Sequence, residues 1–153
     1  MKFFLFGFII IISSCSLKPD LEREKQKLLV LHDQQRTAHF DKNVRNLLAE
    51  QSNDFLQIQK GDITRPSLDE RTQQMQAYFD RVAFDSWDDI EPPIVEISDD
   101  ATMANTFVEK LVVLKLKDEK GKVSLDTTRF AWTTTYRKID GQWRMTAITS
   151  TRQ

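Results

Sequence analysis

The chain has 153 residues, which is enough for one domain of ordinary size and few for two. Its 22 Lys and Arg residues nearly balance its 23 Asp and Glu residues, so it lacks the basic field that nucleic-acid binding requires. The single cysteine excludes a disulfide within the chain, and a hydrophobic fraction of 40%, with 10 Phe, must stabilise the fold by packing.

The first residues, MKFFLFGFIIIISSCS, have the layout of a secretory signal peptide. Lys2 supplies the positive start, an apolar run occupies residues 3–12, and small serines follow. The run is too short to cross a membrane as a helix, which takes about 20 apolar residues. The charged segment KPDLEREKQK ends the hydrophobic stretch. The N-terminus therefore predicts secretion.

The segment ISSC at residues 12–15 resembles the lipobox of bacterial lipoproteins. That resemblance implies diacylglycerol attachment to the Cys15 thiol, cleavage before Cys15 and acylation of the new amine, and two acyl signals make a stable anchor. Ordinary cleavage after Ser16 is the alternative. We expect a location in the bacterial cell envelope, facing the periplasm or the cell surface. The expected signal peptide, tether and folded domain are residues 1–14, 15–20 and 21–153.

Three helices are expected in the first half of the domain. Asp20 can cap a helix over residues 21–40, and Asp41 can cap a short second helix. Ser67 and Glu70 have the spacing of a capping box at the start of a third.

From residue 83 onward the hydrophobic period becomes that of β-strands. Helices followed by a meander of long strands predict an α+β domain with an antiparallel sheet. The expected strands cover residues 83–90, 94–97, 106–117, 123–138 and 142–151, with a shorter one at 55–58 that ends at Gly61-Asp62.

The clearest hairpin signal is Asp140-Gly141, which favours a two-residue type I′ turn. This turn opposes Ile139 to Gln142 and divides the hairpin into two faces. One face is aromatic and apolar with a few hydroxyls, and we expect it to cover the helices and line a pocket. The members of this face proposed to line the pocket are Phe130, Trp132, Thr134, Tyr136, Trp143, Met145 and Thr149.

The other hairpin face is rich in threonine and opposes Arg137 to Arg144. Like charges directly opposed are unfavourable unless an acid or a partner relieves them. Two interpretations remain: a solvated outer face with a neighbouring acid such as Glu109, or a contact with a second copy or another protein.

The order of these elements, with the segments AHFDKN, LLAEQSNDFLQIQKGDITRPSLDE and FAWTTTYRKIDGQWRMTAITSTRQ, resembles the nuclear transport factor 2-like superfamily. The nearest branches are the polyketide cyclase-like (SnoaL-like) and ketosteroid isomerase-like ones, and the resemblance covers residues 21–153. It implies a cone, or cystatin-like roll, in which three N-terminal helices pack into a strongly curved antiparallel sheet. It also implies a pocket at the wide end and an outer sheet face that often dimerises. Function varies widely across this fold.

Enzymes of this superfamily use Asp, His or Tyr inside the cone. The resemblance places a histidine on the last strand where this chain has Thr149. The remaining candidates are His32 and His39, which fall on the apolar stripe of the first helix, and Tyr136, followed by Asp54, Tyr78 and Trp87. The histidines are seven residues apart, whereas a helical metal pair prefers a spacing of four, so we expect no metal and no cofactor.

Three functional hypotheses follow. The first is a lipid-anchored, non-catalytic domain that binds a small apolar or amphipathic ligand or a protein partner. The second is an isomerase, cyclase or dehydratase with His32 or His39 as base and Tyr136 as donor. The third is a homodimeric scaffold that associates through the outer face. Each histidine could instead be a hydrogen-bonded residue at the edge of the core.

Overall fold

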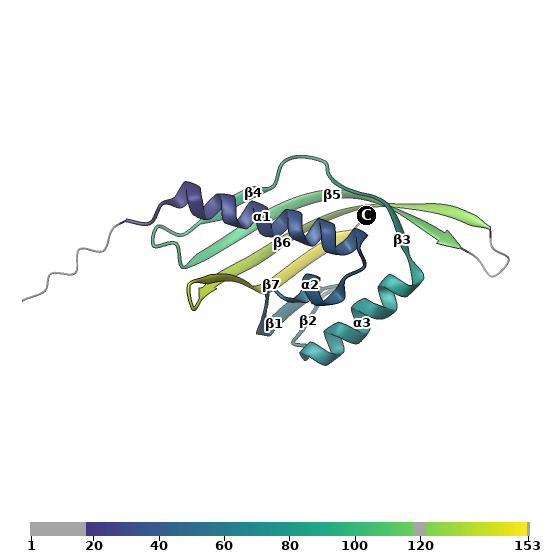
Figure 1. Ribbon diagram of the computed structural model, residues 1–153, viewed down its shortest axis with the longest axis horizontal. Coiled ribbons are helices and arrows are strands. Elements are labelled where there is room, and N and C mark those ends of the chain that lie inside the picture. The colour runs from purple at the N-terminus through teal and green to yellow at the C-terminus, as the bar shows by residue number, and fades with distance from the viewer. Residues whose placement is uncertain (1–17, 118–121, 153) are drawn as a thin grey trace, which may run out of the picture.

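The computed structural model describes residues 18–117 and 122–152. Within these ranges the chain folds into α1 (Leu21–Phe40), α2 (Val44–Leu48) and α3 (Leu68–Arg81), together with one sheet (Figure 1). The strands of the sheet are β1 (Gln51–Gln59), β2 (Asp62–Thr64), β3 (Ala83–Asp89), β4 (Ile94–Ile97), β5 (Met103–Lys117), β6 (Val123–Ile139) and β7 (Gln142–Arg152).

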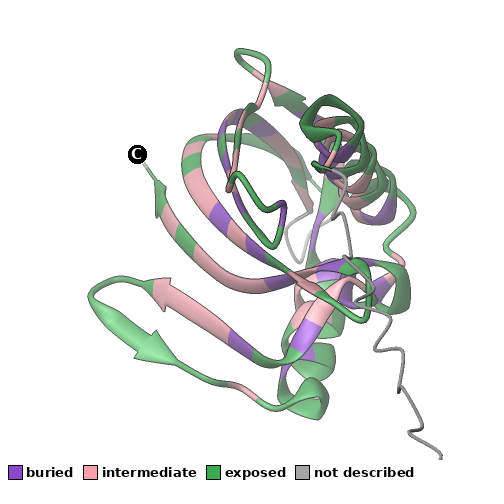
Figure 2. Ribbon diagram, turned by 90° about the vertical axis from the view of Figure 1, so that its left-hand side faces the viewer, coloured by how far each residue is buried: buried purple, intermediate pink, exposed green. Residues whose placement is uncertain are grey.

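The sheet has the strand order β2-β1-β7-β6-β5-β3, and β4 pairs with the free part of β5 beside β3. Its long strands bend strongly, and the sheet does not close on itself (Figure 2). The α+β class and the curved sheet were predicted, but one pairing differs, because β1 runs parallel to β7. Hairpins force adjacent strands to be antiparallel, whereas most of the domain separates β1 from β7 and leaves their direction free.

The helix starts follow local capping chemistry. Asp20 accepts a hydrogen bond from the Arg23 amide at 3.0 Å, and Ser67 and Glu70 form the predicted capping box. The predicted cap of the second helix was wrong, because Asn43 caps α2. Asp41 instead closes α1, donating its backbone N–H to carbonyls of the last helical turn. The intervening Lys42 adopts a φ of 53°, which reverses the chain before Asn43.

The last hairpin has the predicted turn, with φ values of 50° at Asp140 and 77° at Gly141. The predicted register holds from Ile139–Gln142 to Tyr136–Met145. Beyond that point a bulge shifts the pairing by one residue. The partners are then Thr135–Ala147, Thr134–Ile148, Thr133–Thr149 and Trp132–Ser150.

The bulge changes which face part of β7 presents. Thr149 was expected on the inner face, but it is exposed and pairs with Thr133. The side chains of Ile148 and Ser150 point inward in its place. The predicted inner-face position of Thr149 was therefore wrong.

The core consists of two clusters of buried side chains. One joins Leu28 of α1 to the sheet and comprises Leu28, Phe55, Ala104, Tyr136, Trp143 and Met145. The other joins the three helices and comprises Ala38, Val44, Leu47, Leu48 and Phe79. The long hairpin thus packs its aromatic face on α1, as its alternation predicted.

The signal peptide and Cys15 lie outside the described residues. In the part of the chain that is described, no helix is both long and apolar enough to span a membrane.

Candidate functional site

A cavity of about 390 Å³ lies between the helices and the inner face of the sheet. Its volume falls within the range of small-molecule sites, which is about 300–1,000 Å³. Its apolar and aromatic lining comprises Leu47, Phe55, Met75, Tyr78, Trp87, Val112, Phe130, Trp132, Met145 and Ile148. Its polar lining comprises Gln35, His39, Gln51, Gln57, Gln59 and Ser150. Leu47 belongs to one core cluster and Phe55 and Met145 to the other, so the cavity separates the two clusters.

Six of the residues singled out in the sequence line this cavity, namely His39, Tyr78, Trp87, Phe130, Trp132 and Met145. Thr134, Tyr136 and Trp143 also lie on the inner side of the sheet, but they are buried in the packed region beside the cavity. Sequence reasoning missed the contributions of β1 and of Ile148 and Ser150. The alternation of β7 could have found these two residues only if the bulge had been anticipated.

His39 is the titratable cavity residue with the most strongly shifted pKa. Its Nδ1 lies 2.7 Å from the Gln35 carbonyl oxygen, so Nδ1 carries the proton and donates it. The ring stacks on Trp87 with 4.3 Å between centroids and meets Phe79 and Phe84 edge-on. Burial lowers the pKa of His39 to about 4. The positive charge of Lys110 lowers the pKa further, whereas the hydrogen bond to Gln35 opposes the effect. His39 is therefore neutral at pH 7, with Nε2 as a hydrogen-bond acceptor.

His32 lies away from the cavity, in a buried ionic cluster behind Trp87. Its Nε2 is 2.9 Å from Asp89 Oδ2, and Lys110 Nζ is 2.6 Å from Asp89 Oδ1. Lys110 is fully buried, and its Nζ lies 4.0 Å from the centre of the Trp87 ring. Burial lowers the pKa of Lys110, although Asp89 opposes this effect. The cluster connects α1 to β3 and β5. The partner of the His32 ring nitrogen is Asp89, so His32 is a structural residue in this arrangement.

Tyr136 is only 2% exposed and belongs to the core cluster around Leu28. Burial raises the pKa of its phenol, and hydrogen bonding with Thr106, Gln35 and Thr134 opposes the rise only in part. The structure therefore brings His39 to the cavity, but neither His32 nor Tyr136 lines it.

Glu24 is a buried carboxylate that sequence reasoning missed. It lies in the first turns of α1, where an acid interacts favourably with the helix dipole. From the sequence alone, such an acid is expected to be exposed to solvent. Instead it is 5% exposed and accepts hydrogen bonds from Lys27 and Trp143, both at 2.8 Å. Lys138 Nζ approaches it at 2.9 Å. Burial alone would raise the pKa of Glu24, but these three partners outweigh it and lower the pKa to about 2.

The acid expected to relieve the outer arginine pair was also misassigned. Arg137 and Arg144 are paired as predicted, but Glu109 makes its ion pair with Arg129. Arg144 instead donates to the Ala49 carbonyl oxygen at 2.6 Å and lies 3.5 Å from Glu50. Arg144 is thus relieved by groups that directly precede β1.

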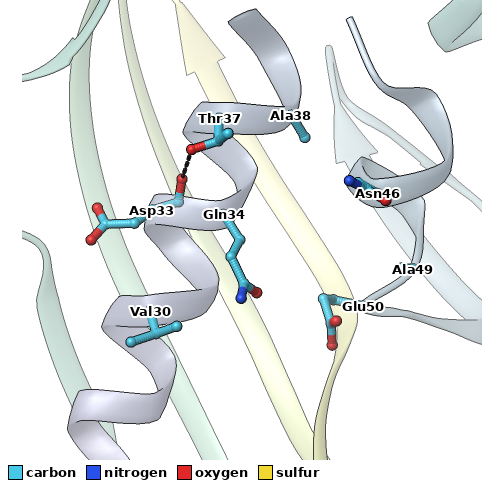
Figure 3. A pocket seen from close by; sticks show the side chains of 8 residues that line it. All are labelled: Val30, Asp33, Gln34, Thr37, Ala38, Asn46, Ala49 and Glu50. Atoms are coloured by element: carbon cyan, nitrogen blue, oxygen red, sulfur yellow. Dashed lines mark hydrogen bonds between the residues drawn. The ribbon is translucent and has the colours of Figure 1, made fainter. Parts of the chain in front are cut away.

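A second hollow of about 450 Å³ lies between α1 and the segment after α2 (Figure 3). Gln34 and Glu50 project into the gap between these segments, whereas Asp33 points away from it (Figure 3). The lining contains no aromatic ring, and its one large apolar side chain, Val30, is 53% exposed. This hollow lacks the enclosing apolar walls of a typical ligand site. Among residues 18–117 and 122–152, no cluster of three or more His, Cys, Asp or Glu residues could hold a metal ion.

No protein-family profile and no curated protein sequence matches the chain. Solved structures do. A ketosteroid isomerase-like protein from Erwinia carotovora atroseptica is 17% identical, with a TM-score of 0.65 over 84% of this chain and 95% of that one. An NTF2-like protein with a cystatin-like fold from Novosphingobium aromaticivorans is 14% identical, with a TM-score of 0.62 over 85% and 82%.

The association domain of C. elegans CaMKII is 14% identical, with a TM-score of 0.58 over 85% of this chain and 96% of that one. At such low identities these likenesses establish the fold and leave the activity open. The chain therefore has the nuclear transport factor 2-like, cystatin-like fold that its sequence resembles.

Proposed function

We propose that this domain binds a small amphipathic molecule in the inner-face cavity without transforming it, and that Cys15 anchors it to a bacterial envelope membrane. The cavity is the observation that carries the binding proposal. It combines several aromatic walls with a few polar groups, as small-molecule sites do. Among the described residues no carboxylate lines it, and the Tyr136 hydroxyl that would accompany a histidine base is packed elsewhere. Binding therefore fits the lining better than acid–base catalysis.

The test uses two neighbouring positions on β7 that face opposite sides of the sheet. Ser150 lines the cavity, and Thr149 is exposed on the outer side. In the domain from residue 18 onward, which contains both core clusters, Ser150→Leu should weaken binding of the neutral dye N-phenyl-1-naphthylamine about tenfold by filling the cavity. Thr149→Leu should leave dye binding unchanged. Failure of the unmodified domain to bind the dye, or equal losses in both variants, would contradict the proposal.

A second candidate function is association between copies of the domain. Outward-facing side chains of β4 and β5 form an apolar outer patch, with exposures of 37% to 62%. The members of this outer patch are Ile94, Met103, Phe107 and Leu111. The CaMKII structure with this fold is described as an association domain, which favours the same role here. Cavity binding and self-association use opposite faces of the sheet and are compatible.

A further inference from the structure

The lining of the inner-face cavity is uncharged at neutral pH. Among its described members none is Asp, Glu, Lys or Arg, and charged residues make up 29% of the whole chain. The two titratable members are also neutral, because burial lowers the pKa of His39 and raises that of Tyr78. An ion placed in such a site loses its hydration and gains no counter-charge, so it is strongly disfavoured.

The nearest buried cations do not compensate for this. Lys110 lies behind the Trp87 ring and is paired with Asp89. Arg71 lies behind Phe55, with its guanidinium carbon 5.4 Å from the centre of that ring.

The Arg71 guanidinium is also occupied by oxygen acceptors of the protein. It donates to Gln51 Oε1 at 2.7 Å and to the Ser52 carbonyl oxygen at 3.3 Å. Neither of these two buried cations lines the cavity, and both are held by oxygens of the protein.

The acceptor nitrogen of His39 places a second requirement on a ligand. Its Nδ1–H is committed to the Gln35 carbonyl, so Nε2 can only accept a hydrogen bond while the ring is neutral. No partner for Nε2 is found in the part of the chain that the structure describes. A bound molecule that satisfies this nitrogen must therefore donate a hydrogen bond to it, as a hydroxyl group does.

The walls next to His39 are aromatic and broad. Trp87 carries the stacked imidazole on its ring and meets Trp132 at 5.7 Å between centroids. Phe130 and Tyr78 add further rings to the lining. Ring compounds pack well against such surfaces, in offset-stacked or edge-to-face contacts.

We propose that the cavity selects uncharged ring compounds that carry a hydroxyl group, with the ring packed among the aromatic side chains and the hydroxyl donating to His39 Nε2. This inference rests on the proposed binding function and adds the class of ligand. It excludes carboxylates and ammonium compounds of the same size.

A matched series of naphthalene compounds tests both parts of the inference. 2-Naphthol is neutral and has a donor, 2-methoxynaphthalene is neutral without a donor, and 2-naphthoate is an anion. Calorimetric titration of the domain from residue 18 onward at pH 7.5 should show 2-naphthol binding about fivefold more tightly than its methyl ether. 2-Naphthol should also bind at least about a hundredfold more tightly than 2-naphthoate.

The two histidines of the chain provide matched variants. His39→Phe keeps an aromatic ring but removes the acceptor, so the preference for 2-naphthol over its methyl ether should disappear. His32→Gln, outside the cavity, should retain that preference. The amide of the introduced glutamine can still donate to Asp89.

The outcomes separate this inference from the proposal on which it rests. Comparable binding of 2-naphthoate, or a preference for 2-naphthol that survives in His39→Phe, would overturn the selection while leaving the cavity as a binding site. If none of the three compounds binds, and N-phenyl-1-naphthylamine also fails to bind, the binding function itself is overturned.

Discussion

Glu24 couples the start of α1 to the last hairpin through a single carboxylate. Three donors from Lys27, Lys138 and Trp143 surround it, and its exposed fraction is 5%. A buried acid with such partners stabilises the fold only while it is ionised. Its replacement leaves the Lys138 ammonium, itself only 23% exposed, without its counter-charge.

Glu24→Gln should therefore lower the free energy of unfolding by about 3 kcal/mol at pH 7. The folded-state pKa of Glu24 is about 2 and its ordinary value is 4.5, so its contribution is complete above pH 4.5 and is lost as the pH falls toward 2. Urea unfolding followed by tryptophan fluorescence should show a smaller loss of stability between pH 4.5 and 2 in the variant. The exposed Glu22, two residues earlier on α1, provides the control Glu22→Gln, which should change the unfolding free energy by less than about 0.5 kcal/mol.

His39 affects stability in a different pH range. Its pKa falls from 6.5 to about 4 on folding, so the unfolded chain binds the proton more tightly than the folded one. Its contribution is complete above pH 6.5 and is lost as the pH falls through 4, by up to about 3 kcal/mol.

His39→Phe should flatten this part of the stability curve. The comparison is made by urea unfolding at pH 7.5, 5.5 and 4, with the wild-type domain measured in parallel. Parallel curves for the two proteins would show that His39 is not responsible for the loss of stability between pH 6.5 and 4.

At the scale of the elements, Asp89 and Lys110 are directly opposed on β3 and β5, and His32 of α1 closes the cluster from above. Asp89→Asn leaves the fully buried ammonium without its counter-charge and should destabilise the domain by about 3 kcal/mol. Lys110→Met removes that problem, and Asp89 keeps its contact with His32.

The double variant should therefore be more stable than the sum of the two single changes predicts, by about 1–3 kcal/mol. A double-mutant cycle in urea measures this coupling. Additive effects would mean that the two side chains act independently in spite of their 2.6 Å separation.

The parts of the fold that could be predicted from the sequence are those fixed by local chemistry. The capping box at Ser67 and the turn at Asp140-Gly141 determine their own geometry, and the alternation of β6 and β7 identifies the inner face. The bulge in β7 could not be predicted. Apart from Ile148, the residues beside it, TAITST, are small or hydroxylated on both faces, so a one-residue shift changes little in the apparent burial pattern.

Residues of the cavity could be predicted only where the periodicity of a continuous segment places them on the inner face. His39, Phe130, Trp132 and Met145 belong to two stretches whose periodicity is clear. The glutamines of β1 reach the cavity because β1 pairs with β7, and this long-range contact has no local signal. Buried ions such as Glu24 and Lys110 were missed for a related reason, since a charged residue in a polar segment looks solvated until its partners are known.

At the scale of the whole molecule, α1 separates the start of the folded domain from the cavity. Leu21 and His39 lie near opposite ends of this helix, about 27 Å apart at 1.5 Å per residue. If Cys15 is anchored in a membrane, as proposed, the cavity lies at the end of α1 that is farther from the anchor in the sequence.

The anchor itself can be tested by labelling cells with a radioactive fatty acid. The full-length chain should incorporate the label, and Cys15→Ala should abolish it, because Cys15 is the only thiol in the chain. Ser16→Ala should be labelled normally, because it leaves the ISSC segment intact. Labelling of Cys15→Ala would refute the lipobox interpretation.

The outer patch comprises Ile94 on β4 and Met103, Phe107 and Leu111 on β5, and Asn105 and Glu109 lie between the β5 members on the same face. The β5 residues between these outward positions, such as Ala104 and Val108, are buried on the inner side. Removing such a surface from water on association is favourable in proportion to its apolar area. On β6, Thr133 lies beside Phe107, whereas Arg137 and Arg129 lie beside Met103 and Leu111 at the two ends of the patch. We expect a dissociation constant for the dimer in the micromolar range, because small interfaces are typical of weak complexes.

Sedimentation velocity of the domain from residue 18 onward should therefore show a sedimentation coefficient that rises with concentration toward the dimer value. Phe107→Lys places a charge in the centre of the patch and should yield a monomer at all concentrations. Val30→Lys on α1 introduces the same charge at a position that is 53% exposed but on the helical side, and it should leave association unchanged. A wild-type domain that stays monomeric at about 100 μM, well above a micromolar dissociation constant, would contradict association through this face, because mass action would then require a dimer.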